Sequence, residues 1–167
     1  MDAHGKTEAA VLVPLVGEGP DPVIIFTERR SDLRRHAGEI SFPGGRREGP
    51  EEELLVTALR ESEEEIGLGR DRVELLGALP PIGTFVTNYK VHPFVGVVGE
   101  ETELEPNPLE VAAVLHFRVS ELNRAFAMRR LVRMGVPIRT PTYDVGDHLI
   151  WGATARILGE LLERLAD

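Results

Sequence analysis

Cysteine is absent from this sequence, and its absence excludes several kinds of chemistry. A chain without thiols forms no disulfides, binds no metal through thiolates and uses no cysteine nucleophile. This composition fits a reducing compartment, so we expect a cytoplasmic protein. With 167 residues the chain is long enough to bury its own core without disulfides, and we expect a single domain over residues 1–167.

Long apolar runs are also missing. No stretch approaches the roughly 20 residues that cross a bilayer, and the start of the chain lacks the basic patch and apolar segment of a signal peptide. The formal net charge of −9 argues against general nucleic-acid binding, because phosphate backbones require a basic surface. We therefore expect neither a membrane nor a nucleic acid as partner.

Lysine is scarce, since only Lys6 and Lys90 occur among the 19 basic residues. Several arginines gather between residues 29 and 47, just ahead of an acidic run over residues 48–65. Arginine is suited to binding phosphate through paired hydrogen bonds. A GC-rich or heat-adapted genome gives the same bias, so the arginine content alone does not indicate a phosphate ligand.

Short apolar runs bounded by glycine, proline and aspartate predict strands. The first two, residues 9–16 and 22–27, are expected to form an antiparallel pair. Pro137 and Pro141 disfavour a central strand, so residues 137–145 are expected to form an exposed hairpin arm. Further extended segments are expected at residues 39–42, 73–79, 89–98 and 111–119.

Helical patterns mark other segments. One helix is predicted to begin near Pro50, because proline is favoured in a first turn and the acids at 51–53 suit the positive end of the helix dipole. Gly67 is expected to cap it. A short helical patch is expected from Ser120, and a closing helix over residues 149–165. The core-facing stripe of the first helix is Leu55, Leu59, Ser62 and Ile66. Strands and helices in this order predict an α/β fold with a mixed sheet between helices.

The first helix has an unusual acidic face. At about 100° per residue, Glu61, Glu64 and Glu65 share one arc, whereas Glu63 falls on the opposite side. Three neighbouring carboxylates repel one another unless a cation neutralises them, and hard oxygen ligands suit Mg²⁺ or Mn²⁺. A solvated acidic surface is the alternative explanation of such a run.

The segment from Gly44 to Leu68, GGRREGPEEELLVTALRESEEEIGL, resembles the Nudix box. That pattern runs Gly, five residues, Glu, seven residues, Arg-Glu-apolar-x-Glu-Glu-x-Gly-apolar. The loop after the glycines carries one extra residue here, and Ser62 replaces the usual apolar residue. The acidic partner of Arg60 therefore stays open, and the candidates are Glu51, Glu52 and Glu53.

The resemblance implies a Nudix-type α/β/α sandwich and a pyrophosphohydrolase acting on a small-molecule diphosphate. It further implies that Glu61, Glu64 and Glu65 bind Mg²⁺ or Mn²⁺, joined by the carbonyl of Gly45. Arg60 would hold these glutamates in place through hydrogen bonds. Bound metal ions neutralise a diphosphate, orient it and lower the pKa of the attacking water.

A separate general base is expected from outside this helix. Glu103, Glu105 and Glu110 lie in the appropriate part of the chain. We favour Glu110, because a Glu-Val pair just ahead of a strand resembles a recurrent position of the family. An exposed loop acid without a catalytic role is the alternative for this residue.

A second motif lies upstream and is similar to the signature of the coenzyme A pyrophosphatase branch of the Nudix family. The matching residues are Thr27, Arg29, Arg34, Gly38, Phe42, Pro43, Gly44 and Gly45. Arg30 departs from that signature, which has a small residue at this position. The segment LGALPPIGTFVTNYKVHPFVGVV and the Trp151-Gly152-x-Thr154 sequence also resemble this branch, so the resemblance spans nearly the whole chain.

This second resemblance implies cleavage of coenzyme A or its thioesters to 3′,5′-ADP and (acyl-)4′-phosphopantetheine. Arg29 and Arg34 offer guanidinium groups for phosphates, unless they pair with nearby acids. Gly38, Phe42 and Gly44 belong to the same substrate-binding motif.

Two other functions remain open from the sequence. The metal site would also serve hydrolysis of another nucleoside diphosphate derivative such as ADP-ribose, and a non-catalytic nucleotide-binding module is the third reading. A homodimer is compatible with the sequence, although no apolar stripe requires one. The segment over residues 129–145 is expected to act either as a substrate lid or as a dimer arm.

Overall fold

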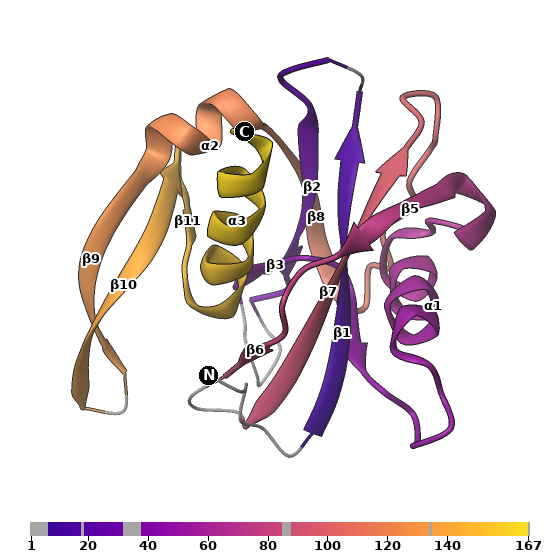
Figure 1. The fold of residues 1–167 in the computed structure, drawn as a ribbon, viewed down its shortest axis with the longest axis horizontal. Coiled ribbons are helices and arrows are strands. Elements are labelled where there is room, and N and C mark those ends of the chain that lie inside the picture. Colours follow the sequence, from indigo (N-terminus) through magenta and orange to yellow (C-terminus); the bar gives the residue numbers. More distant parts are fainter. Residues whose placement is uncertain (1–6, 18, 32–37, 85–87, 134, 167) are drawn as a thin grey trace.

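The computed structural model describes residues 7–17, 19–31, 38–84, 88–133 and 135–166 (Figure 1). Its main sheet contains β1 (Thr7–Val16), β2 (Val23–Arg29), β3 (Ile40–Ser41), β4 (Gly44–Arg46), β5 (Val73–Ala78), β6 (Ile82–Gly83), β7 (Tyr89–Val98) and β8 (Val111–Arg118). A second sheet contains β9 (Phe126–Arg133), β10 (Val136–Val145) and β11 (His148–Ile150). The helices are α1 (Leu54–Ile66), α2 (Val119–Ala125) and α3 (Gly152–Leu165), with a 3₁₀ turn at Arg70–Arg72.

The long strands β1 and β7 form the centre of the main sheet. They run parallel, from the pair Thr7 and Tyr89 to the pair Val16 and Val98. The other pairings are antiparallel: β2 and β4 with β1, β3 and β8 with β2, and β5 and β6 with β7. The sheet is therefore mixed, as predicted, and the β1–β2 pair lies where the sequence indicated.

Each face of the sheet buries a hydrophobic core. On one face α1 packs Ala58 and Ile66 into a cluster with Leu12, and on the other α3 packs Ile157 into a cluster with Val13. Successive strand residues point to opposite faces, so the neighbours Leu12 and Val13 serve different cores. Figure 1 shows α1 and α3 on opposite sides of the sheet. The predicted α/β sandwich is confirmed.

The predicted start of α1 near Pro50 is wrong, because the helix begins only after Glu53. The Glu52 amide donates to the Gly49 carbonyl at 3.1 Å, so Pro50 lies second in a β-turn, where its fixed φ is also favoured. Glu53 is extended, with ψ of 141°. The predicted end is confirmed: Gly67 has a φ of 68° and its amide donates to the last turn.

The core-facing stripe of α1 is confirmed only in its second half. Ser62 and Ile66 are buried, whereas Leu55 and Leu59 are partly covered. The Ser62 hydroxyl donates to the Ala58 carbonyl at 2.7 Å, which satisfies its polar group inside the core. A small hydroxyl residue therefore replaces an apolar one here without leaving an unpaired donor.

A β-arm, defined as the β9–β10 hairpin over residues 126–145, projects beside α3 (Figure 1). The hairpin predicted over residues 137–145 is confirmed as β10, while its partner β9 was not predicted. The closing helix begins at Gly152 instead of residue 149, because β11 first pairs with β10. Among the described residues, no helix is long and apolar enough to cross a membrane.

Candidate active site

Two of the three predicted metal-binding carboxylates turn inward from α1. The Glu61 side chain is 18% exposed and Glu65 is largely covered, whereas Glu64 is 54% exposed. Glu63 is exposed, as the helical arc predicted. The acidic face of α1 is therefore not one uniform solvated surface.

Arg60 connects the carboxylates to the loop before the helix. Its guanidinium donates to Glu52 at 2.9 and 3.2 Å, to Glu61 at 3.1 Å and to Glu64 at 3.4 Å. Another of its N–H groups donates to the Arg46 carbonyl at 3.2 Å, which ties β4 to α1. The acidic partner that the sequence left open is Glu52, the candidate reached by counting back from Arg60.

Glu52 is held as an anion. The Arg60 hydrogen bonds, followed by that of the Thr57 hydroxyl at 2.6 Å, lower the pKa of Glu52 from 4.5 to about 2. A third donor is the Glu48 amide at 3.1 Å. The sequence did not indicate these supporting contacts, because Glu52 lies in a turn ahead of the helix that its carboxylate braces.

The two glycines of β4 allow close approaches on two sides, to β1 and to α1. A Cβ on Gly45 would lie 2.6 Å from Cδ of Glu61, and a Cβ on Gly44 would lie 2.3 Å from the Ala10 carbonyl. A side chain at position 44 would therefore clash with backbone, and one at position 45 would displace the Glu61 carboxylate. The Gly44 amide also interacts with the Glu65 carboxylate and opposes the rise of its pKa. Gly44 thus allows β4 to lie close to β1, and Gly45 allows the Glu61 carboxylate of α1 to lie close to β4.

The carboxylate of Glu65 is affected by burial and by neighbouring negative charges. Burial, followed by the charges of Glu61 and Glu110, raises the pKa of Glu65 to about 8, and the charge of Arg29 opposes the shift. Burial also raises the pKa of Glu61, against the hydrogen bond from Arg60. The excess of negative charge around Glu65 suits a cation.

The loop ahead of β8 brings Glu110 to this cluster. The Asn107 amide donates to the Glu65 carbonyl at 2.8 Å, and the Arg30 amide donates to the Glu110 carbonyl at 3.1 Å. Glu105 instead lies against Gly67 at the end of α1. Of the three acids proposed as a base, only Glu110 lies on the cavity described next.

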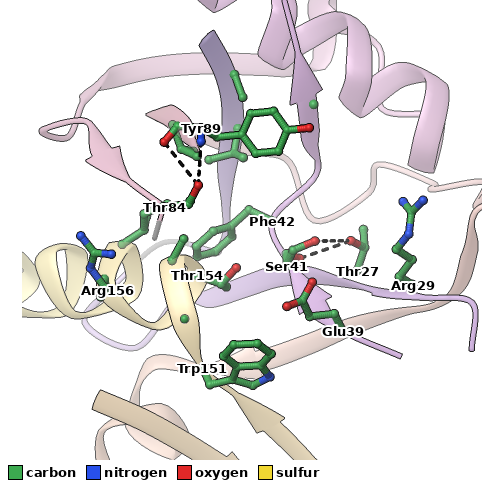
Figure 2. Close-up of a pocket in the computed structure, with 18 of the residues that line it drawn as sticks. Thr27, Arg29, Glu39, Ser41, Phe42, Thr84, Tyr89, Trp151, Thr154 and Arg156 are labelled. Atoms are coloured by element: carbon green, nitrogen blue, oxygen red, sulfur yellow. Dashed lines mark hydrogen bonds between the residues drawn. The ribbon is translucent and has the colours of Figure 1, made fainter. Parts of the chain in front are cut away.

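A cavity of about 770 Å³ opens between the main sheet, α3 and the β-arm. Glu65 and Glu110 lie on its wall, and so do Gly44 and Gly45. Figure 2 shows Thr27, Ser41 and Phe42 along it, with Tyr89 and Trp151 on other walls. The volume is within the range of small-molecule binding sites.

Most of the upstream motif lines this cavity, namely Thr27, Arg29, Phe42, Gly44 and Gly45. Phe42 is only 2% exposed and stacks on Phe26, so it offers the cavity no more than an edge. Gly38 is not among the lining residues; it occupies a turn with a φ of 72°, and its amide donates to the Arg29 carbonyl. Arg34 lies outside the described residues.

Comparison with known proteins decides the family. A family model described as the NUDIX domain matches residues 6–134. This chain belongs to the Nudix family. Two relatives, both named uncharacterized Nudix hydrolase NudL, match almost its full length. The protein of Pectobacterium atrosepticum is 34% identical over 98% of this chain and 85% of its own, and that of Photorhabdus laumondii is 36% identical over 98% and 87%.

Solved Nudix structures share the fold. A C. elegans Ap4A hydrolase, solved as a binary complex, matches with a TM-score of 0.63 over 96% of this chain and 98% of its own, at 13% identity. A MutT/nudix family protein from Enterococcus faecalis matches with a TM-score of 0.64 over 100% of this chain and 64% of its own, at 15% identity. The protein is thus a Nudix pyrophosphatase that acts on a nucleoside diphosphate derivative.

Nudix hydrolases generally use divalent metal ions. Among the described residues, no three acidic or histidine side chains form a complete metal-binding group. Glu64 is turned toward Arg60 and solvent, and its charge still contributes to the raised pKa of Glu61. The donor set nevertheless fits a hard cation, because burial and the charges of neighbouring carboxylates raise the pKa of both Glu61 and Glu65, and a cation would relieve both effects.

Residues of α3 and of the segment just before it form part of the cavity wall, and few of them were predicted from the sequence as site residues. Trp151 and Thr154 line it, and their resemblance to the signature was the available signal. Thr84 and Tyr89 are joined there by a 2.8 Å bond from the Tyr89 amide to the Thr84 hydroxyl. Arg156 also lines the cavity, and no local pattern distinguishes it from a solvated helix residue.

Proposed function

We propose that this Nudix enzyme hydrolyses the diphosphate of coenzyme A or its thioesters to 3′,5′-ADP and (acyl-)4′-phosphopantetheine. The observation that carries the proposal is the meeting of two separate motifs in one cavity. Arg29 and Phe42 of the upstream motif share its wall with Glu65 of the Nudix box. A substrate seated there contacts both motifs at once.

The metal-binding role falls to the carboxylates of α1. Glu61, Glu64 and Glu65, with the Gly45 carbonyl, would hold Mg²⁺ or Mn²⁺, which supplies neutralisation of the diphosphate and a lowered pKa of the attacking water. Glu64 would turn from Arg60 to complete this set. Arg60 would keep Glu61 in place through its 3.1 Å hydrogen bond.

Glu110 is our candidate for accepting the proton of the attacking water. It lies on the cavity wall, and its charge acts on both Glu61 and Glu65. The Asn107 and Arg30 bonds hold its loop against α1 and β2. Water attacks directly in this scheme, and no covalent intermediate forms.

Arg29 is our candidate for contacting the diphosphate. It lines the cavity close enough to Glu65 for its charge to act on that carboxylate. A guanidinium beside metal-binding carboxylates can pair with a phosphate oxygen on the side turned away from the metal. Arg34 is proposed for the same kind of contact on the sequence motif alone.

The proposal is tested by product analysis. Purified protein is incubated with coenzyme A, acetyl-coenzyme A or ADP-ribose, each with Mg²⁺ or Mn²⁺, and the products are separated by chromatography. We expect 3′,5′-ADP from coenzyme A and its thioester, and slower turnover of ADP-ribose. Preferential cleavage of ADP-ribose would retain the Nudix chemistry and refute coenzyme A as the substrate.

A further inference from the structure

Arg156 occupies the end of the cavity opposite the glutamates. Figure 2 shows its side chain beside Thr84, while Arg29 lies at the far side, with Phe42 and Thr154 between them. Arg46, which follows Gly45 in β4, is the other arginine on the wall. The cavity therefore has a cation at each end.

Within the described part of the chain, no carboxylate compensates the charge of Arg156. Its guanidinium donates to the Gly83 carbonyl at 3.0 Å, and no described carboxylate is within ion-pair distance. Glu160, one helical turn further along α3, pairs instead with Arg164 at 3.6 Å. Burial lowers the pKa of Arg156, and no neighbouring anion opposes this effect.

The remaining donors of Arg156 are available to a ligand. A guanidinium carries five N–H groups, and the Gly83 carbonyl uses one of them. Two parallel N–H groups match the oxygens of a phosphate monoester or a carboxylate. A ligand that fills the cavity from Glu65 to Arg156 would present its diphosphate at one end and another group at the other.

We propose that Arg156 binds a second anionic group of the substrate, distant from the diphosphate, and so selects substrates that carry one. The inference rests on the proposed function for the identity of the compounds. In coenzyme A compounds two groups have this chemistry: the 3′-phosphate, and the terminal carboxylate of a dicarboxylic acyl chain. Both bind a guanidinium in the same way, and matched substrates separate them.

A purely structural role is the competing explanation. The bond from Arg156 to Gly83 links α3 to β6 and could serve only to stabilise this wall. Such a role predicts a lower melting temperature and equal losses on all substrates. A binding role predicts a loss confined to substrates with the second anion.

The test compares two pairs of substrates in wild type, Arg156→Gln and Arg156→Lys. Coenzyme A is paired with 3′-dephospho-coenzyme A, and succinyl-coenzyme A with butyryl-coenzyme A. We expect wild type to prefer the more anionic member of one pair by about tenfold in kcat/KM, mainly through KM. Arg156→Gln should reduce that preference to about twofold or less, and Arg156→Lys should retain part of it. The pair that responds identifies the anion.

Arg164→Gln is the matched control, because Arg164 lies on the same helix, pairs with Glu160 and does not line the cavity. It should leave the wild-type preference unchanged. Equal losses on both members of each pair in Arg156→Gln, or no loss on any, would overturn the inference.

Calorimetric titration with the same pairs, without metal, separates this inference from the proposed function. If no coenzyme A compound is cleaved, the proposed function fails, while binding still tests Arg156. A weaker affinity of Arg156→Gln for only the more anionic member supports the inference. Equal affinities of wild type and variant for every compound overturn it.

Discussion

At the scale of single residues, Arg60 connects several groups of the site. One guanidinium holds Glu52, Glu61 and Glu64, and it also binds the Arg46 carbonyl. Glu52 orients it in turn, so a residue in a turn controls the geometry of carboxylates on the following helix. Charge-assisted bonds of this kind are stronger than neutral ones, particularly for a side chain that is only 18% exposed.

Replacing Glu52 should change how stability depends on pH. Its folded pKa is lowered to about 2 from 4.5, so its stabilisation is fully present above pH 4.5 and is lost as pH falls toward 2. The difference in free energy of unfolding between wild type and Glu52→Gln should therefore shrink over that window, as measured by urea titration. Glu51→Gln is the control, since it removes an exposed neighbouring charge that is not bonded to Arg60, and it should stay near wild type at pH 7. A pH-independent difference would contradict the ion pair.

Gly45→Ala should impair the site more than the fold. The new Cβ would lie within 2.9 Å of three atoms of the Glu61 carboxyl group, so the carboxylate must move. We expect kcat to fall by about tenfold or more and stability by about 1–3 kcal/mol. Gly49→Ala, where a Cβ meets nothing within 4 Å, is the matched control. Wild-type kcat in Gly45→Ala would show that this close approach is unimportant.

At the scale of elements, local patterns predicted most strands of the main sheet and the ends of α1 and α3, but they misplaced where these two helices begin. The segment predicted over residues 89–98 is β7, because alternating burial in a long strand leaves a clear pattern. The start of α1 was misplaced because proline favours both a first helical turn and the second position of a β-turn. Only the contacts of Glu52 with Arg60 and Thr57, which depend on the folded helix, favour the turn.

The β-arm is the element that the sequence left most open, between a lid and a dimer contact. Its two faces differ: Leu131 and Ile138, paired across the hairpin, line the cavity, whereas Val132 is 61% exposed on the other face. Alternation along the strand assigns these residues to opposite sides. This arrangement favours a role in covering the substrate. Because the two faces carry different residues, variants of each face can be compared.

Replacing both Leu131 and Ile138 by serine should weaken substrate binding. Each loses apolar surface from the cavity wall, worth about 0.8 kcal/mol per buried CH₂ group. We expect KM for the preferred substrate to rise about fivefold or more, with kcat less affected. Val132→Ser is the matched control and should keep the wild-type KM. Equal kinetics in the double variant and the control would exclude the arm from the substrate site.

At the scale of the whole molecule, the site combines segments far apart in the chain. The Nudix box and the upstream motif were predictable, because each is a continuous pattern. Glu110 was one of three candidates, and its place on the cavity wall distinguishes it from Glu105, which lies against Gly67 at the end of α1. Arg156 carried no signal, because an arginine on an amphipathic helix is ordinarily solvated. The roles of such residues depend on contacts between distant segments, and local sequence periodicity does not predict these contacts.

Metal binding should stabilise the whole molecule. A ligand that binds only the folded state adds RT ln(1 + [L]/Kd), about 2.7 kcal/mol when the ligand is at 100 times its Kd. Mg²⁺ should therefore raise the melting temperature by several degrees in wild type. Glu65→Gln should lose most of this shift, and Glu63→Gln, which changes an exposed carboxylate on the opposite side of α1, should keep it. An equal shift in both variants would place the metal elsewhere.

The central claim is that the inward carboxylates of α1 support metal-dependent diphosphate hydrolysis. Its most direct test is to measure kcat for coenzyme A at saturating Mg²⁺ in wild type, Glu65→Gln and Glu63→Gln. Removing a carboxylate that holds a catalytic metal should lower kcat by about a hundredfold or more in Glu65→Gln. Glu63→Gln should remain within about twofold of wild type, since its side chain is exposed. A Glu65→Gln enzyme within about tenfold of wild type would contradict the claim.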